Sequence, residues 1–265
     1  MSDEQEMLRQ QYADASNLAA RSRLHSRFQT NKYGWLRWIF DQFELTQLCS
    51  ILELGCGNAA LWMSNYQRIG QDWDITLSDF SAGMLDEARR NLAKFGNKFD
   101  FAVIDAQAIP FENGRFDVVI ANHMLYHVAD LEKGLGEIRR VLKDGGRLYA
   151  TTNGDDHMRE LREMVKPFAP ELPFVQHDNA KAFSLENGAG KLMRYFKTLK
   201  MVQYEDSLEV TEIEPIMDWV LSVRGAKAVF TPNTIAQLRQ LLLAKLQERG
   251  VINITKTNGM FIAKA

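Results

Sequence analysis

The sequence predicts an α/β protein with a Rossmann-like fold: a seven-stranded, mostly parallel sheet with an antiparallel last strand, helices on both faces and a helical cap. Three observations support this fold class. Short apolar runs alternate with helical patterns between residues 50 and 152, a glycine-rich turn follows the first run, and the alternation stops after Asn153. Short strands that alternate with helices are typical of a parallel sheet that is covered on both faces.

The centre of the predicted sheet lies between residues 50 and 152. Its apolar runs have the length of buried strands, and the segments between several of them have helical periodicity. Before this region, residues 13–48 carry apolar and aromatic side chains at helical spacing. We expect strands over 50–54, 73–78, 99–104, 116–121 and 147–152, and helices over 59–68, 82–95 and 131–142, the last ended by Gly145-Gly146.

The chain after Asn153 is organised differently. The dipeptide Asn258-Gly259 lies between the last two apolar segments and favours a tight turn between antiparallel segments. Residues 251–265 are therefore expected to form an antiparallel closing strand or a hairpin. Before them we expect mixed helix and loop over 155–197, a strand over 201–210, and helices over 212–223 and 233–249.

Composition and charge exclude several kinds of protein. The formal net charge of −2 and the scattered basic residues give no sign of nucleic-acid binding. The two cysteines, Cys49 and Cys56, are too few for a disulfide framework or a cysteine-rich metal site, so no metal is expected. No apolar run approaches the ~20 residues that cross a bilayer, and the acidic N-terminus does not resemble a secretory signal. We therefore expect a soluble, cytoplasmic protein without a membrane partner, and the sequence predicts no oligomeric state.

A glycine-rich turn follows the first predicted strand. Glycines let the backbone bend sharply and approach a ligand closely, while the next helix presents free N–H groups. The turn also satisfies the dinucleotide fingerprint G-x-G-x-x-G/A, so a nicotinamide cofactor stays open at this point. Glu53 precedes the turn by two residues, where its carboxylate could meet a ligand's ammonium group. The turn consists of Gly55, Cys56, Gly57 and Asn58.

Polar residues follow the next three predicted strands as well. Asp79 ends the second strand, where a carboxylate can accept hydrogen bonds from both hydroxyls of a ribose. Asp105, which begins Asp105-Ala106-Gln107, follows the third and could accept from an adenine amino group. Asn122 and His123 follow the fourth, at the edge where open α/β sheets bind ligands.

In four stretches the sequence resembles the class I S-adenosylmethionine (SAM)-dependent methyltransferase family, strongly over residues 48–153 and weakly to the C-terminus. The stretches occur in the family's order. One position departs from its E/D-x-G-x-G-x-G motif, because Ala59 stands at the third glycine. The stretches are ILELGCGNA (51–59), LSDFSAGMLDEAR (77–89), IDAQAIPFENGRFDVVIANHMLYHV (104–128) and EIRRVLKDGGRLYATT (137–152).

The resemblance implies a SAM cofactor and a role for each matching residue. Glu53 and the glycine turn match the site of the methionine half, and Asp79 matches the ribose-binding acid. Phe80 and Met84 match positions that flank the adenine, while Asp105, Ala106 and Gln107 match its edge. Asn122 and His123 line the place where the methyl group meets its acceptor, with His123 as the first candidate for a general base. His127 and Tyr12 complete the candidate cofactor-binding residues.

Several of these residues also have plainer interpretations. Asp79 could be a solvated loop acid, and Asp105 could cap the turn that follows it. His127 could stack beside Tyr126 or cap the next helix, and His123 could equally be a packing residue. Cys56 is interpreted as a small filler in the turn. The remaining histidines, expected at surface or packing positions, are His25, His157 and His177.

The resemblance also suggests the domain organisation and the acceptor. We expect one domain with an N-terminal helical lid (1–47), a SAM-binding core (48–153), a substrate cap with an accessory strand (154–250) and the closing segment (251–265). A small organic acceptor is favoured, because helical segments on both sides of the core could close over a pocket. An NAD(P)-dependent oxidoreductase, a methyltransferase acting on protein or RNA, and a non-catalytic binding protein remain as alternatives.

Overall fold

The structure is a computed structural model that describes residues 16–96 and 98–265, with side chains from Ala20 onward. Its centre is a seven-stranded sheet in the order β3-β2-β1-β4-β5-β7-β6, in which β7 pairs antiparallel with both of its neighbours and the other pairs are parallel. The predicted fold class is thus confirmed. The strands are β1 (Cys49–Leu54), β2 (Trp73–Asp79), β3 (Phe99–Val103), β4 (Phe116–Asn122), β5 (Leu142–Asn153), β6 (Thr198–Val210) and β7 (Ile252–Lys264).

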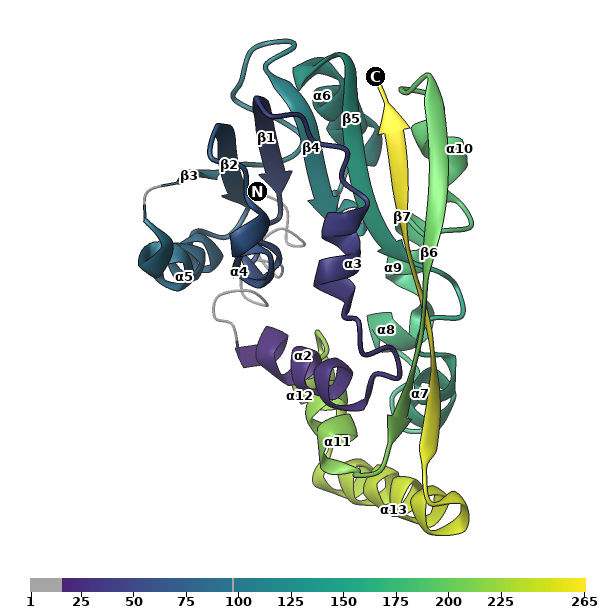
Figure 1. Ribbon diagram of the computed structural model, residues 1–265. Coiled ribbons are helices and arrows are strands. Elements are labelled where there is room, and N and C mark those ends of the chain that lie inside the picture. Colours follow the sequence, from purple (N-terminus) through teal and green to yellow (C-terminus); the bar gives the residue numbers. More distant parts are fainter. Residues whose placement is uncertain (1–15, 97) are drawn as a thin grey trace.

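Helices cover the sheet and build a separate cap (Figure 1). Those before β5 are α2 (Ser16–Phe28), α3 (Trp35–Asp41), α4 (Ala60–Ser64), α5 (Ala82–Leu92) and α6 (Leu131–Val141), with 3-10 turns at η1 (Tyr66–Arg68), η2 (Ala93–Phe95) and η3 (Leu125–His127). Those after β5 are α7 (Arg159–Val165), α8 (Pro173–Gln176), α9 (Asp178–Ala182), α10 (Gly188–Leu192), α11 (Glu214–Leu221), α12 (Ala226–Val229) and α13 (Pro232–Arg249).

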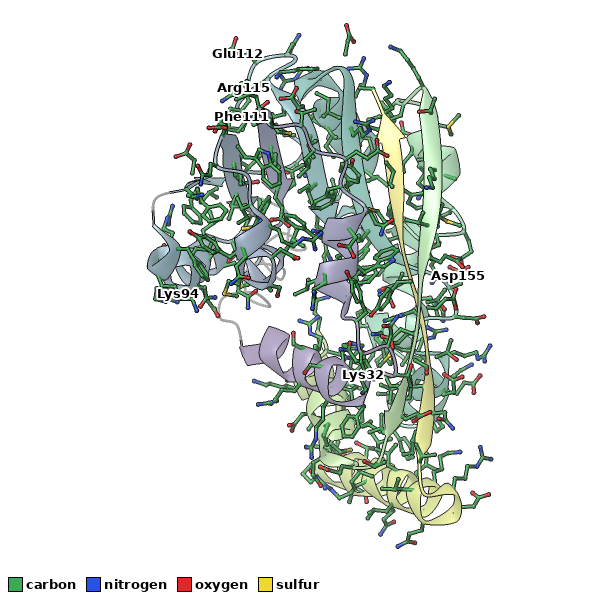
Figure 2. All side chains as sticks on the ribbon, viewed as in Figure 1. Lys32, Lys94, Phe111, Glu112, Arg115 and Asp155 are labelled. Carbon is green, nitrogen blue, oxygen red and sulfur yellow. The ribbon has the colours of Figure 1, made fainter. Side chains whose placement is uncertain are left out.

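The central strands are buried on both faces, as a parallel sheet with helices on both sides requires. All six residues of β1 are buried, and two apolar clusters pack against the two faces of the sheet. The carboxyl ends of β1, β2 and β4 point toward α2 and α3 (Figure 1). Phe111, Glu112 and Arg115 lie at the opposite end of the sheet (Figure 2).

The last two strands extend beyond the sheet and carry the cap. β5 pairs with β7 from Arg147–Lys264 to Asn153–Asn258, whereas β6 continues to pair with β7 as far as Val210–Ile252. Residues 252–257 therefore form a two-stranded ribbon with β6 alone. A third apolar cluster, with members from α2, α7, α11 and α13, packs around this ribbon. The ribbon holds the cap helices opposite the carboxyl ends of the parallel strands (Figure 1).

Three predicted element boundaries were wrong. Asn258-Gly259 makes no turn, because both residues lie within the continuous strand β7. Gly259 fits there for another reason: a Cβ at this position would lie 2.7 Å from the carbonyl oxygen of Val202. Gly145-Gly146 lies inside β5, since α6 already ends at Val141. The helical region expected over 13–48 divides into α2 and α3, with Gly34 at φ 96° before α3.

The described residues include no helix that is both long and apolar enough to cross a membrane.

Candidate functional site

A cavity of about 1040 Å³ lies at the carboxyl ends of the parallel strands, between the core and the cap. Every candidate site residue of the sequence analysis lines it except Tyr12, which lies outside the described residues. Strand ends bring these residues together although they are dispersed over the sequence. The lining candidates are Glu53, Gly55, Cys56, Gly57, Asn58, Asp79, Phe80, Met84, Asp105, Ala106, Gln107, Asn122, His123 and His127.

The glycine turn after β1 has the left-handed conformation that its sequence favours. Gly55 and Gly57 have φ values of 69° and 56°, a region that glycine adopts without steric cost. A Cβ on Gly55 would also lie 2.9 Å from the Cβ of Met124. Ala59 has φ 63° at the position of the family's third glycine, so it adopts the backbone that a glycine would adopt more easily. The buried Cys56 side chain fits the role of a small filler.

Glu53 is a buried carboxylate held by neutral donors. Its Oε2 accepts a hydrogen bond from Trp62 Nε1 at 2.6 Å, and its Oε1 accepts one from Asn122 Nδ2 at 3.1 Å. No ion pair to it occurs among the described side chains. Burial raises the pKa of Glu53 to about 7, because the charged form lacks the hydration it would have in water. A cationic ligand group beside this carboxylate would restore its charged form.

Asp79 fixes the glycine turn. Its Oδ2 accepts a hydrogen bond from the backbone N–H of Gly57, and its Oδ1 accepts one from Ser81, both at 2.9 Å. Burial is the largest influence on the Asp79 carboxyl, and it raises the pKa of that group. Asp79 is therefore not a solvated loop acid, and its position beside the turn leaves further lone pairs for a ligand.

Asp105 both caps a turn and lines the cavity. Its Oδ1 accepts hydrogen bonds from the backbone N–H of Gln107 at 2.9 Å and from Nε2 of the same residue at 3.0 Å. The turn-capping interpretation is thus confirmed. Gln107 in turn accepts from the backbone N–H of Asp130 through its Oε1. The hydrogen bonds from Gln107 thereby fix the carboxylate of Asp105 on the lining of the cavity.

His123 has a strained backbone at the end of β4. Its φ is 49°, which is uncommon for a residue other than glycine, and such strain tends to occur at functional sites. Its N–H donates to both the carbonyl and the Oγ1 of Thr151, each at 3.1 Å. The ring packs 5.5 Å from that of Trp35. Burial, followed by the positive charge of Lys256, lowers the pKa of His123 to about 4, so the ring is neutral at pH 7.

His127 packs against Tyr126 in an edge-to-face arrangement, with ring centroids 4.6 Å apart at 68°. The alternative that it caps the next helix was wrong, because the side chain of Asp130 accepts from Lys133 N–H and caps α6. Burial, then the charge of Arg224, lowers the pKa of His127 to about 3.

The other three histidines share one location that their spacing in the sequence did not predict. His25, His157 and His177 line the cavity, so all five histidines of the sequence do. His157 Nδ1 accepts from the backbone N–H of Thr257 at 3.3 Å, and its ring stacks on His25 with centroids 6.3 Å apart. Burial is the first cause that lowers the pKa of each, to about 3 for His25. Their spacing in the sequence could not predict this shared location, because the packing of α2 against the chain after β5 brings them together. In the described part of the chain, no group of three or more His, Cys, Asp or Glu side chains is placed to hold a metal.

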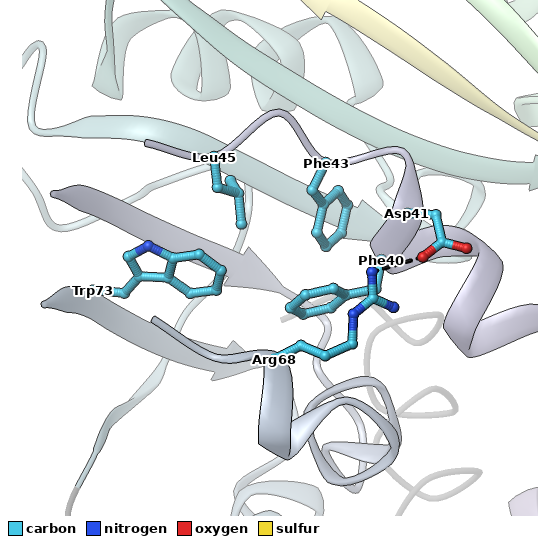
Figure 3. A pocket seen from close by; sticks show the side chains of 6 residues that line it. All are labelled: Phe40, Asp41, Phe43, Leu45, Arg68 and Trp73. Atoms are coloured by element: carbon cyan, nitrogen blue, oxygen red, sulfur yellow. Dashed lines mark hydrogen bonds and ion pairs between the residues drawn. The ribbon is translucent and has the colours of Figure 1, made fainter. Parts of the chain in front are cut away.

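A smaller hollow of about 300 Å³ lies elsewhere and is lined by Phe40, Asp41, Phe43, Leu45, Arg68 and Trp73 (Figure 3). Arg68 donates to Asp41 Oδ1 at 2.6 Å, and its guanidinium carbon lies 4.6 Å from the centre of the Phe40 ring. Trp73 donates through Nε1 to the carbonyl of Thr46. The polar groups of this lining thus already have hydrogen-bond partners within the protein. We interpret the hollow as a gap where α3 packs against the sheet, not as a ligand site.

Comparison with known proteins identifies the core. A family model described as a methyltransferase domain matches residues 52–150. The ubiquinone/menaquinone biosynthesis C-methyltransferase UbiE of Hahella chejuensis is 31% identical over 116 residues, which cover 43% of this chain and 47% of that protein. The demethylmenaquinone methyltransferase of Clavibacter sepedonicus is 34% identical over 141 residues, covering 52% and 56% respectively. The match thus spans about half the length of these relatives.

Solved structures show the same fold. The YcgJ protein from Bacillus subtilis superposes with a TM-score of 0.60 at 14% identity, covering 86% of this chain and 97% of that one. Phosphoethanolamine N-methyltransferase 2 of Haemonchus contortus, in complex with S-adenosyl-L-methionine, has a TM-score of 0.62 at 19% identity and covers 100% of this chain and 60% of that one. The resemblance seen in the sequence is confirmed over the core, where residues 52–150 match the methyltransferase-domain family and the relatives are SAM-type methyltransferases in sequence and fold.

Proposed function

We propose that the protein transfers a methyl group from SAM to a small organic acceptor that is bound in the same cavity. One observation carries this proposal: the glycine turn and the carboxylates of Glu53, Asp79 and Asp105 converge on one cavity, in the order that the family's motifs follow. The cavity, at about 1040 Å³, reaches the upper end of the range of roughly 300–1,000 Å³ for drug-sized ligands. It therefore has room for a cofactor and a small second molecule.

The cofactor's parts have matching partners along the strand ends. The buried carboxylate of Glu53 suits the ammonium of the methionine half, and the glycine turn suits close approach of its backbone. We assign Asp79 to the ribose hydroxyls, Asp105 with Ala106 to the adenine edge, and Phe80 and Met84 to positions that flank the adenine. SAM supplies an activated methyl on a sulfonium, so the protein's part is to orient the acceptor and to exclude water.

His123 is the proposed general base for an acceptor that needs deprotonation. It lies next to Asn122, which donates to Glu53, so it adjoins the proposed site of the methionine half. Its neutral ring can accept a proton at pH 7. An acceptor that is already a nucleophilic anion would use the same ring for positioning only.

The relatives are named for ubiquinone/menaquinone biosynthesis and for demethylmenaquinone, and this chain spans only about half the length of those proteins. The likeness therefore does not by itself assign a quinone acceptor. Aromatic side chains on the cavity lining, Trp35, Tyr126, Phe174 and Trp219, suit a planar organic molecule. We propose a cytoplasmic location, as the sequence suggests.

Calorimetry with SAM and with NADH tests the proposed cofactor. We expect saturable binding of SAM and of S-adenosylhomocysteine at one site per chain, and no heat from NADH. Binding of NADH without binding of SAM would favour the oxidoreductase alternative. Methyl transfer to a panel of small molecules, measured from labelled SAM, then separates an enzyme from a non-catalytic binding protein.

The N-terminal segment is the proposed lid. Arg21, His25 and Trp35 from α2 and α3 line the cavity, which fits a segment that closes over bound ligands. Part of α2 is nevertheless scaffold, because Leu24 and Phe28 are buried in the cluster around the ribbon. Hydrogen exchange tests the lid: we expect SAM to increase protection over residues 11–22, which include Tyr12. Equal protection in both states would make the segment plain scaffold.

A further inference from the structure

Charges are separated within the cavity. The acidic side chains among its described lining residues are Glu53, Asp79 and Asp105, all at the ends of β1, β2 and β3. We call these three the core wall. The basic side chains on the lining lie elsewhere and are Arg21, Arg37, Arg162, Arg224 and Lys256. The lining contributed by α2 and by the chain after β5 is called the cap wall, and its cations and histidines are Arg21, His25, His157, Arg162, His177, Arg224 and Lys256.

One of these cations is neutralised inside the protein. Lys256 forms a buried ion pair with Asp206, which also accepts from the backbone N–H groups of Asn31 and Ser207. This pair joins β6 to β7 and adds little net charge to the cavity.

Two other cations of the cap wall keep their charge. Arg162 donates to the backbone carbonyls of Asp155 and His157, which satisfies its hydrogen bonds without neutralising it. Arg224 is half-buried and forms no ion pair with the described residues. Arg224 lines the same cavity as His127. A partly buried cation without a counter-ion is a strong site for an anion.

The neutral histidines add adaptable hydrogen-bonding groups to this positive region. Since His157 Nδ1 accepts from Thr257, its ring proton resides on Nε2 and is available as a donor. The Nδ1 atom of His25 is buried and has no hydrogen-bond partner among the described residues. Each ring is held neutral by burial and by the nearby cations, so an anion in the cavity would favour its protonated form.

We propose that the methyl acceptor is an organic anion, whose carboxylate or phosphate group binds the cap wall beside Arg224. This inference rests on the proposed function, because it assigns the space that SAM leaves free. SAM itself brings one carboxylate, which one cation can balance. The cavity lining has several cationic side chains. Those that SAM does not need lie on the cap wall, away from the three carboxylates that suit the cofactor.

The five histidines make the test direct, because every histidine signal in an NMR spectrum comes from the cavity lining. Protein saturated with S-adenosylhomocysteine is titrated with benzoate, phenyl phosphate and neutral benzamide, and dissociation constants are taken from the histidine ring shifts. We expect at least one of the two anions to bind about tenfold more tightly than benzamide, as a charge-assisted hydrogen bond requires. Which anion binds more tightly distinguishes a carboxylate from a phosphate acceptor.

Two variants complete the test. Arg224→Gln should weaken binding of the preferred anion about tenfold while leaving S-adenosylhomocysteine affinity unchanged. Lys227→Gln removes the same charge from exposed α12, does not touch the cavity, and should change neither. Equal binding of benzamide and both anions, or an Arg224→Gln variant with unchanged anion affinity, would overturn the anionic acceptor. Failure of S-adenosylhomocysteine to bind the wild type would instead overturn the proposed function.

Discussion

The two walls of the cavity are built in different ways. Each acid of the core wall stands at the end of a parallel strand. Hydrogen bonds from the neighbouring turns and strand ends fix it: Glu53 with Trp62 and Asn122, Asp79 with Gly57 and Ser81, Asp105 with Gln107. The cap wall draws its groups from residues as distant as His25 and Lys256, and long-range packing on the β6–β7 ribbon assembles them. The comparison teaches that the cofactor half is encoded locally and rigidly, while the acceptor half depends on tertiary structure.

Removal of the His123 ring should produce the largest effect on turnover. It tests whether the methyl transfer takes place where the two walls meet. Asparagine is the replacement of choice because it tolerates the left-handed backbone of this position. If the ring is the general base, His123→Asn should lower turnover by about 10²–10⁴-fold with little change in SAM affinity. Because the pKa of the ring is about 4, wild-type kcat at saturating SAM, where the bound ammonium keeps Glu53 charged, should hold between pH 7.5 and 5.5. A variant that keeps its turnover would make His123 a packing residue.

Loss of a core-wall carboxylate should weaken the binding of SAM. Asp79→Ala removes the proposed acceptor of two ribose hydroxyls and releases the N–H of Gly57, so SAM binding should weaken by about 1–3 kcal/mol in calorimetry. Asp74→Ala is the matched control, because Asp74 lies near the other end of β2 in an exposed ion pair with Arg115. Unchanged SAM affinity in a folded Asp79→Ala protein would refute the ribose assignment.

The histidines should make the unliganded protein sensitive to acid. Burial lowers the pKa of His25 and His127 to about 3 and that of His123 to about 4, and it also lowers the pKa of His157 well below its ordinary value. Between these values and the ordinary 6.5, the unfolded chain binds protons that the native rings do not, so the free energy of unfolding falls as pH drops below 6.5.

Glu53 acts in the opposite direction, because its pKa is raised from 4.5 to about 7 and its native form holds a proton in that window. Asp79, whose pKa burial also raises, acts in the same direction as Glu53. These are two groups against five histidines with lowered pKa values, so the loss toward acid should dominate. Urea unfolding at pH 7.5 and 5.5 measures the difference, which should shrink in His25→Gln by at most about 1.4 kcal/mol per pH unit. An equal pH dependence in wild type and variant would show that His25 titrates normally in the native state.

The sequence predicted the core wall almost completely, because strand ends and the glycine turn follow local rules. The alternation of strands and helices alone put Glu53, Asp79, Asp105 and His123 at one edge of the sheet, and all four line the cavity. Their ligand roles remain predictions. The cap wall was missed, since nothing in the spacing of His25, His157 and His177 shows that packing brings them together. Turn propensity likewise failed at Asn258-Gly259, where a close approach between β6 and β7 explains the glycine.

The structure of the complex with S-adenosylhomocysteine would test the division of the cavity most directly. We expect the amino group beside Glu53, the ribose at Asp79 and the adenine at Asp105, with Arg224 and the histidines of the cap wall still facing open space. A ligand bound among His25, His157 and Arg224, with the core-wall carboxylates unoccupied, would contradict the account.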